Sequence, residues 1–152
     1  SHELSPPLYE EKTLENILIT ILKSWSSFYQ IKKHIDVRGE FEIEKNIKLQ
    51  LVRILQELIN NTYKHAKASS IMLNLRISPK YIVMMVEDDG LGFKKNNSVK
   101  GIGLQNIELR ADNLEAQYKY KCKENKGTRF ILIFFTFHNL FSNNCISSSY
   151  II

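Results

Sequence analysis

Three features are scarce in this sequence: cysteine, long apolar runs and clustered charge of one sign. The chain has only 2 cysteines, Cys122 and Cys145. That is too few for a framework of several disulfides, so we expect a reducing compartment. No apolar run approaches the roughly 18 residues that span a bilayer, and the longest, residues 130–135, is typical of a buried strand. We therefore expect a cytoplasmic domain without direct membrane contact, while a membrane anchor in the parent protein stays open.

The charge and composition are those of an ordinary soluble domain. Of the residues, 43% are hydrophobic and 24% charged, and the net charge is +5. The basic residues are interleaved with acids and tyrosines, and no basic stripe emerges, so we expect no nucleic-acid partner. A chain of 152 residues is long enough for one domain with a real core and too short for two comfortable ones.

The spacing of apolar residues predicts a regular order of elements. A helical period indicates helices over residues 10–27 and 46–66 and a third that begins at Gly101. Alternation and apolar runs indicate strands over residues 31–41, 71–77, 81–87, 118–122 and 128–135. The order is helix, strand, helix, hairpin, helix, hairpin. It predicts a two-layer α/β (α+β) sandwich, in which helices cover one face of a mixed, mostly antiparallel sheet.

The long helix carries polar side chains beside its apolar stripe. Glu57 and Asn61 are four residues apart and Lys64 is three further on, so all three share one helix face, flanked by Asn60 and His65. An Asn carbonyl oxygen suits Mg²⁺, which takes few protein ligands beside phosphates and waters. A Glu one turn earlier can act as a general base, and a lysine supplies charge for phosphate. The ordinary alternative is a solvated helix face.

A second polar cluster follows the strand at residues 81–87. Asp88 can accept a hydrogen bond from an exocyclic amine such as that of adenine, and Gly90 and Gly92 let the backbone approach the ring. The ordinary alternative is an Asp-Gly hairpin turn. Two glycines with Phe93 close behind exceed what such a turn needs.

Two weaker glycine motifs follow. Gly101, Gly103 and Leu104 place flexible backbone at a helix N-terminus, where free N–H groups and the helix dipole favour phosphate. Gly127 and Thr128 open a strand, and the Thr128 hydroxyl can reach the ring-binding carboxylate directly or through water. Each motif alone would pass as an ordinary helix entry or turn.

Taken in order, the four motifs resemble the N, G1, G2 and G3 boxes of the GHKL ATPase superfamily of kinases, gyrase-type ATPases, chaperones and mismatch-repair ATPases. The sequence is more similar to the ATP-binding catalytic domain of two-component sensor histidine kinases. In one kinase subfamily the N-box helix reads like residues 53–61 and ends Lys-His-Ala, as residues 64–66 do. The same subfamily has Asp-Asp-Gly-x-Gly-Phe, as in residues 88–93, and Gly-x-Gly-Leu-x-Asn-Ile before an Arg-Ala pair, as in residues 101–111.

The resemblance implies a Bergerat fold, the cofactors ATP and Mg²⁺, and a role for each matched residue. The catalytic residues would be Glu57, Lys64 and His65. The metal ligand would be Asn61, and Gly101 and Gly103 would hinge the ATP lid. The ATP-binding residues would be Asn60, Asn61, Asp88, Gly90, Gly92, Gly101, Gly103, Leu104 and Thr128. The function implied is transfer of the γ-phosphate of Mg·ATP to a histidine on a separate dimerisation domain.

The resemblance also divides the chain. Residues 1–9 would be a linker from a dimerisation and phosphoacceptor region, residues 10–136 the catalytic domain, and residues 137–152 a peripheral or disordered tail. His2 lies in a stretch similar to a phosphoacceptor box, but too few residues separate it from the long helix to hold a two-helix hairpin. We therefore expect the acceptor histidine, and the response regulator downstream, on other domains or chains, with a homodimeric parent kinase.

Two alternatives remain at this point. One is a GHKL serine kinase that acts as an anti-sigma factor, a family that lacks the features of residues 53–66. The other is a nucleotide-dependent binding module without transfer chemistry, which the presence of both Glu57 and Asn61 disfavours. The short stretch between the glycine motifs, residues 94–100, disfavours the gyrase, chaperone and repair branches with their longer lids.

Overall fold

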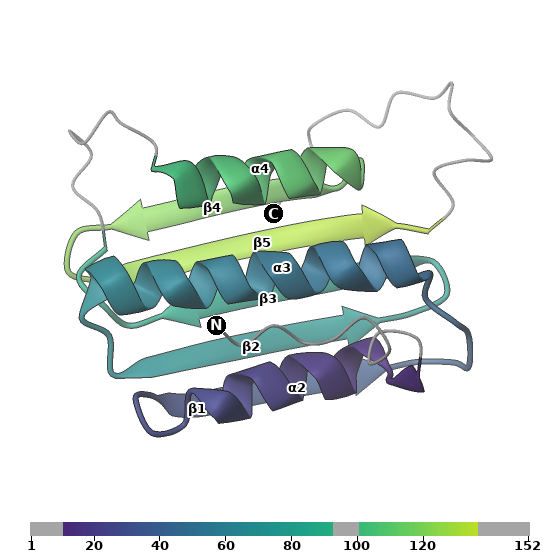
Figure 1. The fold of residues 1–152 in the computed structure, drawn as a ribbon, viewed down its shortest axis with the longest axis horizontal. Helices are drawn as coiled ribbons and strands as arrows, with labels where there is room; N and C mark the ends of the chain where they lie inside the picture. Colours follow the sequence, from purple (N-terminus) through teal and green to yellow (C-terminus); the bar gives the residue numbers. More distant parts are fainter. Residues whose placement is uncertain (1–10, 93–100, 137–152) are drawn as a thin grey trace.

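The computed structural model describes residues 11–92 and 101–136, which form a sheet covered by helices (Figure 1). The helices are α2 (Leu14–Ser24), α3 (Lys45–Asn61), the π-helical turn η1 (Thr62–Ala66) and α4 (Ile102–Asn113). The strands are β1 (Gln30–Val37), β2 (Ser70–Ile77), β3 (Tyr81–Asp88), β4 (Gln117–Lys123) and β5 (Gly127–Phe135). The linker, Phe93, the lid stretch and the tail of the sequence-based predictions lie outside the described residues.

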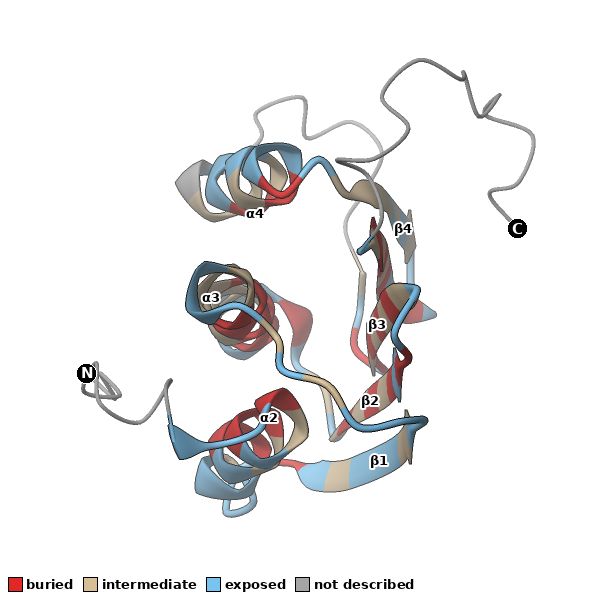
Figure 2. Ribbon diagram, turned by 90° about the vertical axis from the view of Figure 1, so that its right-hand side faces the viewer, coloured by how far each residue is buried: buried red, intermediate tan, exposed pale blue. Residues whose placement is uncertain are grey.

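The five strands form one sheet in the order β1-β2-β3-β5-β4. β1 and β2 are parallel, and the other neighbours are antiparallel. Viewed along the sheet, α2, α3 and α4 all lie on one side of it (Figure 2). The predicted two-layer sandwich with a mixed, mostly antiparallel sheet is confirmed. The insertion of β5 between β3 and β4 was not predicted.

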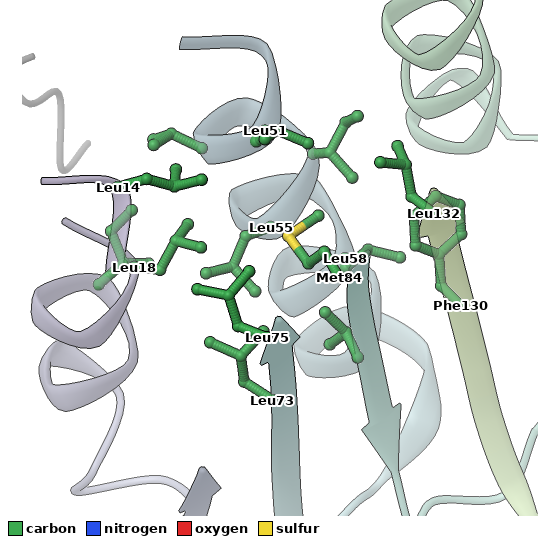
Figure 3. Packing of buried hydrophobic residues seen from close by; sticks show 14 of the residues in the cluster. Leu14, Leu18, Leu51, Leu55, Leu58, Leu73, Leu75, Met84, Phe130 and Leu132 are labelled. Atoms are coloured by element: carbon green, nitrogen blue, oxygen red, sulfur yellow. The ribbon is translucent and has the colours of Figure 1, made fainter. Parts of the chain in front are cut away.

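The core fills the space between the two layers. Alternate residues of β2 and β3 are buried, as the two-residue period of a strand requires. Figure 3 shows the labelled side chains of α2 and α3 directed toward those of the sheet. Fully buried members include Leu14, Leu18, Leu51, Leu55, Leu73, Met84 and Leu132. Within the part of the chain that the structure describes, no helix is long and apolar enough to cross a membrane.

Three predicted boundaries were displaced, each for a local reason. α2 begins at Leu14, where the Thr13 side chain caps the helix by accepting from the Asn16 N–H. β1 ends at Val37, and Gly39 follows with φ 90°, outside the extended region. The helix predicted over residues 46–66 is α-helical only to Asn61 and continues as η1.

Gly127 gives the clearest test of a backbone requirement. It has φ +79°, and a Cβ there would overlap the Asp88 carbonyl oxygen, whereas a Cβ at Gly101 would meet nothing within 4 Å. We expect Gly127→Ala to lower the free energy of unfolding by at least about 2 kcal/mol. Gly101→Ala should change it by less than about 0.5 kcal/mol. Urea unfolding of both variants measures the difference, and equal stabilities would contradict the overlap.

Candidate functional site

The centre of the site is a carboxylate at the end of an apolar row. Ile82, Met84, Val86 and Asp88 are the buried residues of β3 and share its helix-facing side. Asp88 is only 8% exposed. A buried carboxylate is tolerated only when donors satisfy its oxygens, so its partners define the site.

Three donors from three parts of the fold reach Asp88. The Thr62 hydroxyl lies 3.1 Å from Asp88 Oδ2, and the Thr128 hydroxyl donates to the same oxygen. The Gly90 N–H donates to Oδ1 over 2.9 Å. Thr62 is the first residue of η1, and Thr128 is placed by the register of β5, which pairs it with Asp88. The contact between Thr128 and Asp88 is direct, one of the two possibilities that the sequence left open.

Thr62 was missed by the sequence-based prediction. Leu55 and Leu58 belong to the buried apolar stripe of α3, and Thr62, which is also buried, lies four residues beyond Leu58 and seven beyond Leu55. A polar residue that continues a core stripe must bond inside the protein. That spacing was a signal that could have identified it.

Tyr120 also contacts the side chain of Thr128. Burial raises the pKa of Tyr120 to about 12, a rise that the hydrogen bond with the Thr128 side chain partly offsets and the nearby Cys122 and Asp88 increase. Tyr120 therefore stays a neutral phenol at physiological pH.

The neighbouring acid, Asp89, has a different job. Its Oδ1 accepts from the Ser69 N–H over 2.8 Å and the Ser70 N–H over 2.9 Å, at the start of β2. Partial burial alone would raise the pKa of Asp89, but these hydrogen bonds, that of Ser70 first, hold it below its ordinary value. Asp89 therefore ties the turn after β3 to β2, and Asp88 alone faces the site.

A second group of polar atoms lies where α3 and α4 pack. A Cβ built on Gly103 would collide with Glu57 Oε1 and lie 2.8 Å from Asn61 Oδ1, so both oxygens converge on this glycine. The predicted common face of Glu57 and Asn61 is confirmed. A side chain at position 103 would displace the two oxygens from the positions they take here.

The other predicted site residues are distributed around these two groups. Lys64 and His65 are exposed on η1; a π-helix has more residues per turn than an α-helix, so the α-helical spacing that placed Lys64 on the Glu57 face does not apply. The Leu104 N–H donates to the Gly101 carbonyl at the start of α4. Three further predicted residues border the site: Asn60 in α3, Gly90 against Ala66, and Gly92 with φ 66°.

Among residues 11–92 and 101–136, no three or more His, Cys, Asp or Glu side chains lie close enough together to hold a metal ion by themselves. Asn61 with Glu57 beside it fits Mg²⁺, which accepts one or two protein oxygens beside phosphates.

The sequence of the chain matches a known family of ATPases. Residues 46–138 match the family of histidine kinase-, DNA gyrase B- and HSP90-like ATPases. The chain belongs to this ATPase family. The match spans the N, G1, G2 and G3 motifs and confirms the resemblance inferred from them.

Curated relatives of this ATPase domain are bacterial sensor kinases. The chain is 33% identical over 91 residues to sensor protein VraS of Staphylococcus saprophyticus, and the aligned region covers 59% of this chain and 26% of the relative. It is 32% identical over 101 residues to the signal transduction histidine-protein kinase/phosphatase DegS of Brevibacillus brevis, covering 66% and 26%. The chain thus spans about a quarter of the length of these relatives.

Solved structures share the fold of this ATPase domain. The histidine kinase domain of the blue-light activated histidine kinase of Erythrobacter litoralis superimposes with a TM-score of 0.60 and 18% identity, covering 80% of this chain and 58% of the other. Histidine kinase AdeS of Acinetobacter baumannii gives 0.62 and 14%, covering 86% and 73%. The ATPase domain therefore has the sandwich architecture of histidine kinase domains.

The role of Asp89 predicts a pH-dependent stability. The pKa of Asp89 is lower in the folded than in the unfolded protein. Its contribution to the free energy of unfolding is therefore fully present above the unfolded pKa of about 3.9, and it is lost as the pH falls through the folded pKa. At pH 7 we expect the free energy of unfolding of the Asp89→Asn variant to be about 1 kcal/mol lower than that of the wild type. The difference should narrow below about pH 4. Urea unfolding followed by Trp25 fluorescence measures it, with the exposed Glu40→Gln as control; a difference independent of pH would contradict the assignment.

Proposed function

We propose that this chain is the ATP-binding catalytic domain of a sensor histidine kinase, which transfers the γ-phosphate of Mg·ATP to a histidine on a separate dimerisation domain. The observation that carries the proposal is the pairing of two chemically different groups along one helix. The carboxylate of Asp88 lies beside Thr62 at one end of η1. The Glu57 and Asn61 oxygens converge on Gly103.

The Asp88 group suits an adenine ring. An ionised carboxylate has about four lone-pair positions, and Thr62, Thr128 and Gly90 occupy three of them. The remaining position accepts a donor, which the exocyclic amine of adenine supplies and the carbonyl of a 6-oxopurine does not. At Gly90 the missing side chain makes room for Ala66, and the backbone at Gly92 carries no side chain to obstruct the ring.

The Asn61 group suits the phosphates. Asn61 Oδ1 would hold Mg²⁺ together with phosphate oxygens and water, and the metal, when bound, neutralises charge on the transferring phosphoryl group. Lys64 follows Asn61 by three residues and is exposed. It would contribute a point charge to the phosphates, with His65 beside it. The N–H of Gly103 at the start of α4 would face the same phosphates.

Glu57 would act on the acceptor. In the transfer, the bond from the γ-phosphorus to the bridging oxygen of ADP breaks, and a bond from that phosphorus to an imidazole nitrogen forms. A carboxylate that hydrogen-bonds the opposite imidazole N–H orients the ring and accepts or stabilises its proton as positive charge develops. The product is a phosphohistidine, an acid-labile phosphoramidate. The acceptor domain, a downstream response regulator and a homodimeric parent kinase complete the proposed system.

The nucleotide site is tested by calorimetry with ADP, with and without Mg²⁺. Asp88→Ala should weaken ADP binding by about tenfold or more, because a charge-assisted hydrogen bond is lost. Asn61→Ala should remove the gain in affinity that Mg²⁺ gives while leaving metal-free binding intact. The exposed Lys119→Ala on β4 is the control. Unchanged affinity in both site variants would exclude this nucleotide site.

Phosphoryl transfer is tested by mixing the purified domain with [γ-³²P]ATP and a separately expressed dimerisation hairpin. We expect acid-labile, base-stable phosphate on the hairpin. Glu57→Gln should lower the transfer rate by about 10²- to 10⁴-fold with ADP affinity nearly unchanged. Acid-stable phosphate on a serine would support the anti-sigma serine kinase instead, and binding without transfer to either would support a nucleotide-dependent binding module.

A further inference from the structure

We infer that Thr62 is a positioning residue that orients the Asp88 carboxylate toward a 6-aminopurine and so contributes to base specificity; the inference rests on the nucleotide-binding function proposed above. Thr62 is not among the residues to which the resemblance to the N, G1, G2 and G3 boxes assigns a role. It is 7% exposed, so its hydroxyl must find its partner inside the protein.

Two acceptors compete for the single Thr62 hydroxyl proton. Both Leu58 O and Asp88 Oδ2 lie 3.1 Å from Thr62 Oγ1. The Leu58 carbonyl already receives the Thr62 backbone N–H. A carboxylate oxygen is the stronger acceptor, since hydrogen bonds to ionised groups are roughly twice as strong as neutral ones. The geometry therefore assigns the proton to Asp88.

The Thr62 bond changes what the Asp88 carboxylate can do. Thr128 approaches Oδ2 from β5 and Thr62 approaches it from the end of α3, while Gly90 holds Oδ1. With donors from the sheet, the helix and the turn, rotation of the carboxylate about its last bond would break at least two of them. The free lone pair therefore keeps one direction. Without Thr62, Oδ2 has one protein donor fewer and the carboxylate turns more freely.

The consequence is specific to the amine of the base. An aligned carboxylate gains from a 6-amino group and gains nothing from a purine that has only hydrogen at that position. Loss of Thr62 should therefore weaken ADP but spare the diphosphate of unsubstituted purine riboside. A merely structural role would weaken both ligands together.

The experiment uses the whole 152-residue chain and measures the Kd of both nucleotides with Mg²⁺ for wild type, Thr62→Val and Thr62→Ser. Valine keeps the shape and removes the hydroxyl; serine restores it. We expect Thr62→Val to raise the Kd for ADP by about tenfold, the size of coupling between contacting groups. The Kd for the purine riboside diphosphate should stay within about twofold of the wild-type value. Thr62→Ser should recover most of the loss.

A matched control separates loss of a helical hydroxyl from loss of the Asp88 contact. Thr20 in α2 also donates to a carbonyl four residues back, Asn16 O, over 2.9 Å, but is exposed. Thr20→Val should leave both affinities unchanged, and thermal unfolding of each variant sets a temperature at which all are folded. In an Asp88→Asn background, adding Thr62→Val should weaken ADP by much less than tenfold, because the carboxylate it orients is gone.

The outcomes are distinguishable. A wild type that does not bind ADP would overturn the proposed function and this inference with it. A wild type that binds ADP, with Thr62→Val unchanged, would overturn this inference alone. Equal weakening of both nucleotides, or failure of serine to rescue, would assign Thr62 a structural role and also overturn it.

Discussion

The buried carboxylate of Asp88 is the constraint on which the rest of this structure depends. A charge with 8% exposure is stable only if donors surround it, and its donors come from η1, β5 and the turn after β3. All three elements must therefore be in place at once. The pairing of Asp88 with Thr128 across two strands makes sheet register a condition of the site, so fold and site form together.

The opposite half of the site obeys a different constraint. Glu57 and Asn61 are half-buried. Their side-chain oxygens lie close together because Gly103 of α4 has no side chain to occupy that position. Hydrogen bonds fix the Asp88 end before any ligand arrives, whereas the Asn61 end leaves its oxygens available. Such a division suits the proposed nucleotide, whose ring is held in one place while its phosphate chain stays accessible for the proposed transfer.

The sequence predicted what depends on local periodicity. Alternation identified β2 and β3, the helical stripe identified α2 and α3, and a four-residue spacing placed Glu57 and Asn61 on one face. What it could not predict depends on distant pairing or on one turn of backbone. The place of β5 between β3 and β4 is a non-local choice, and so is the direct contact of Thr128. Asp88 and Asp89 look alike in sequence, and only the position of β2 decides which of them accepts the Ser69 and Ser70 N–H groups.

One short segment couples the two halves. Asn61 is the last residue of α3 and Thr62 the first of η1, so adjacent residues belong to the Glu57–Asn61 group and to the Asp88 group. At the other end of η1, the Leu91 N–H donates to the Ala66 carbonyl over 2.6 Å and ties the turn after Asp88 to the same helix. A shift of η1 would therefore move the Asn61 oxygen and the Asp88 carboxylate together. Because both ends of this turn are hydrogen-bonded to Asp88 or to the turn after it, the proposed ring-binding carboxylate and the proposed metal ligand belong to one connected part of the fold.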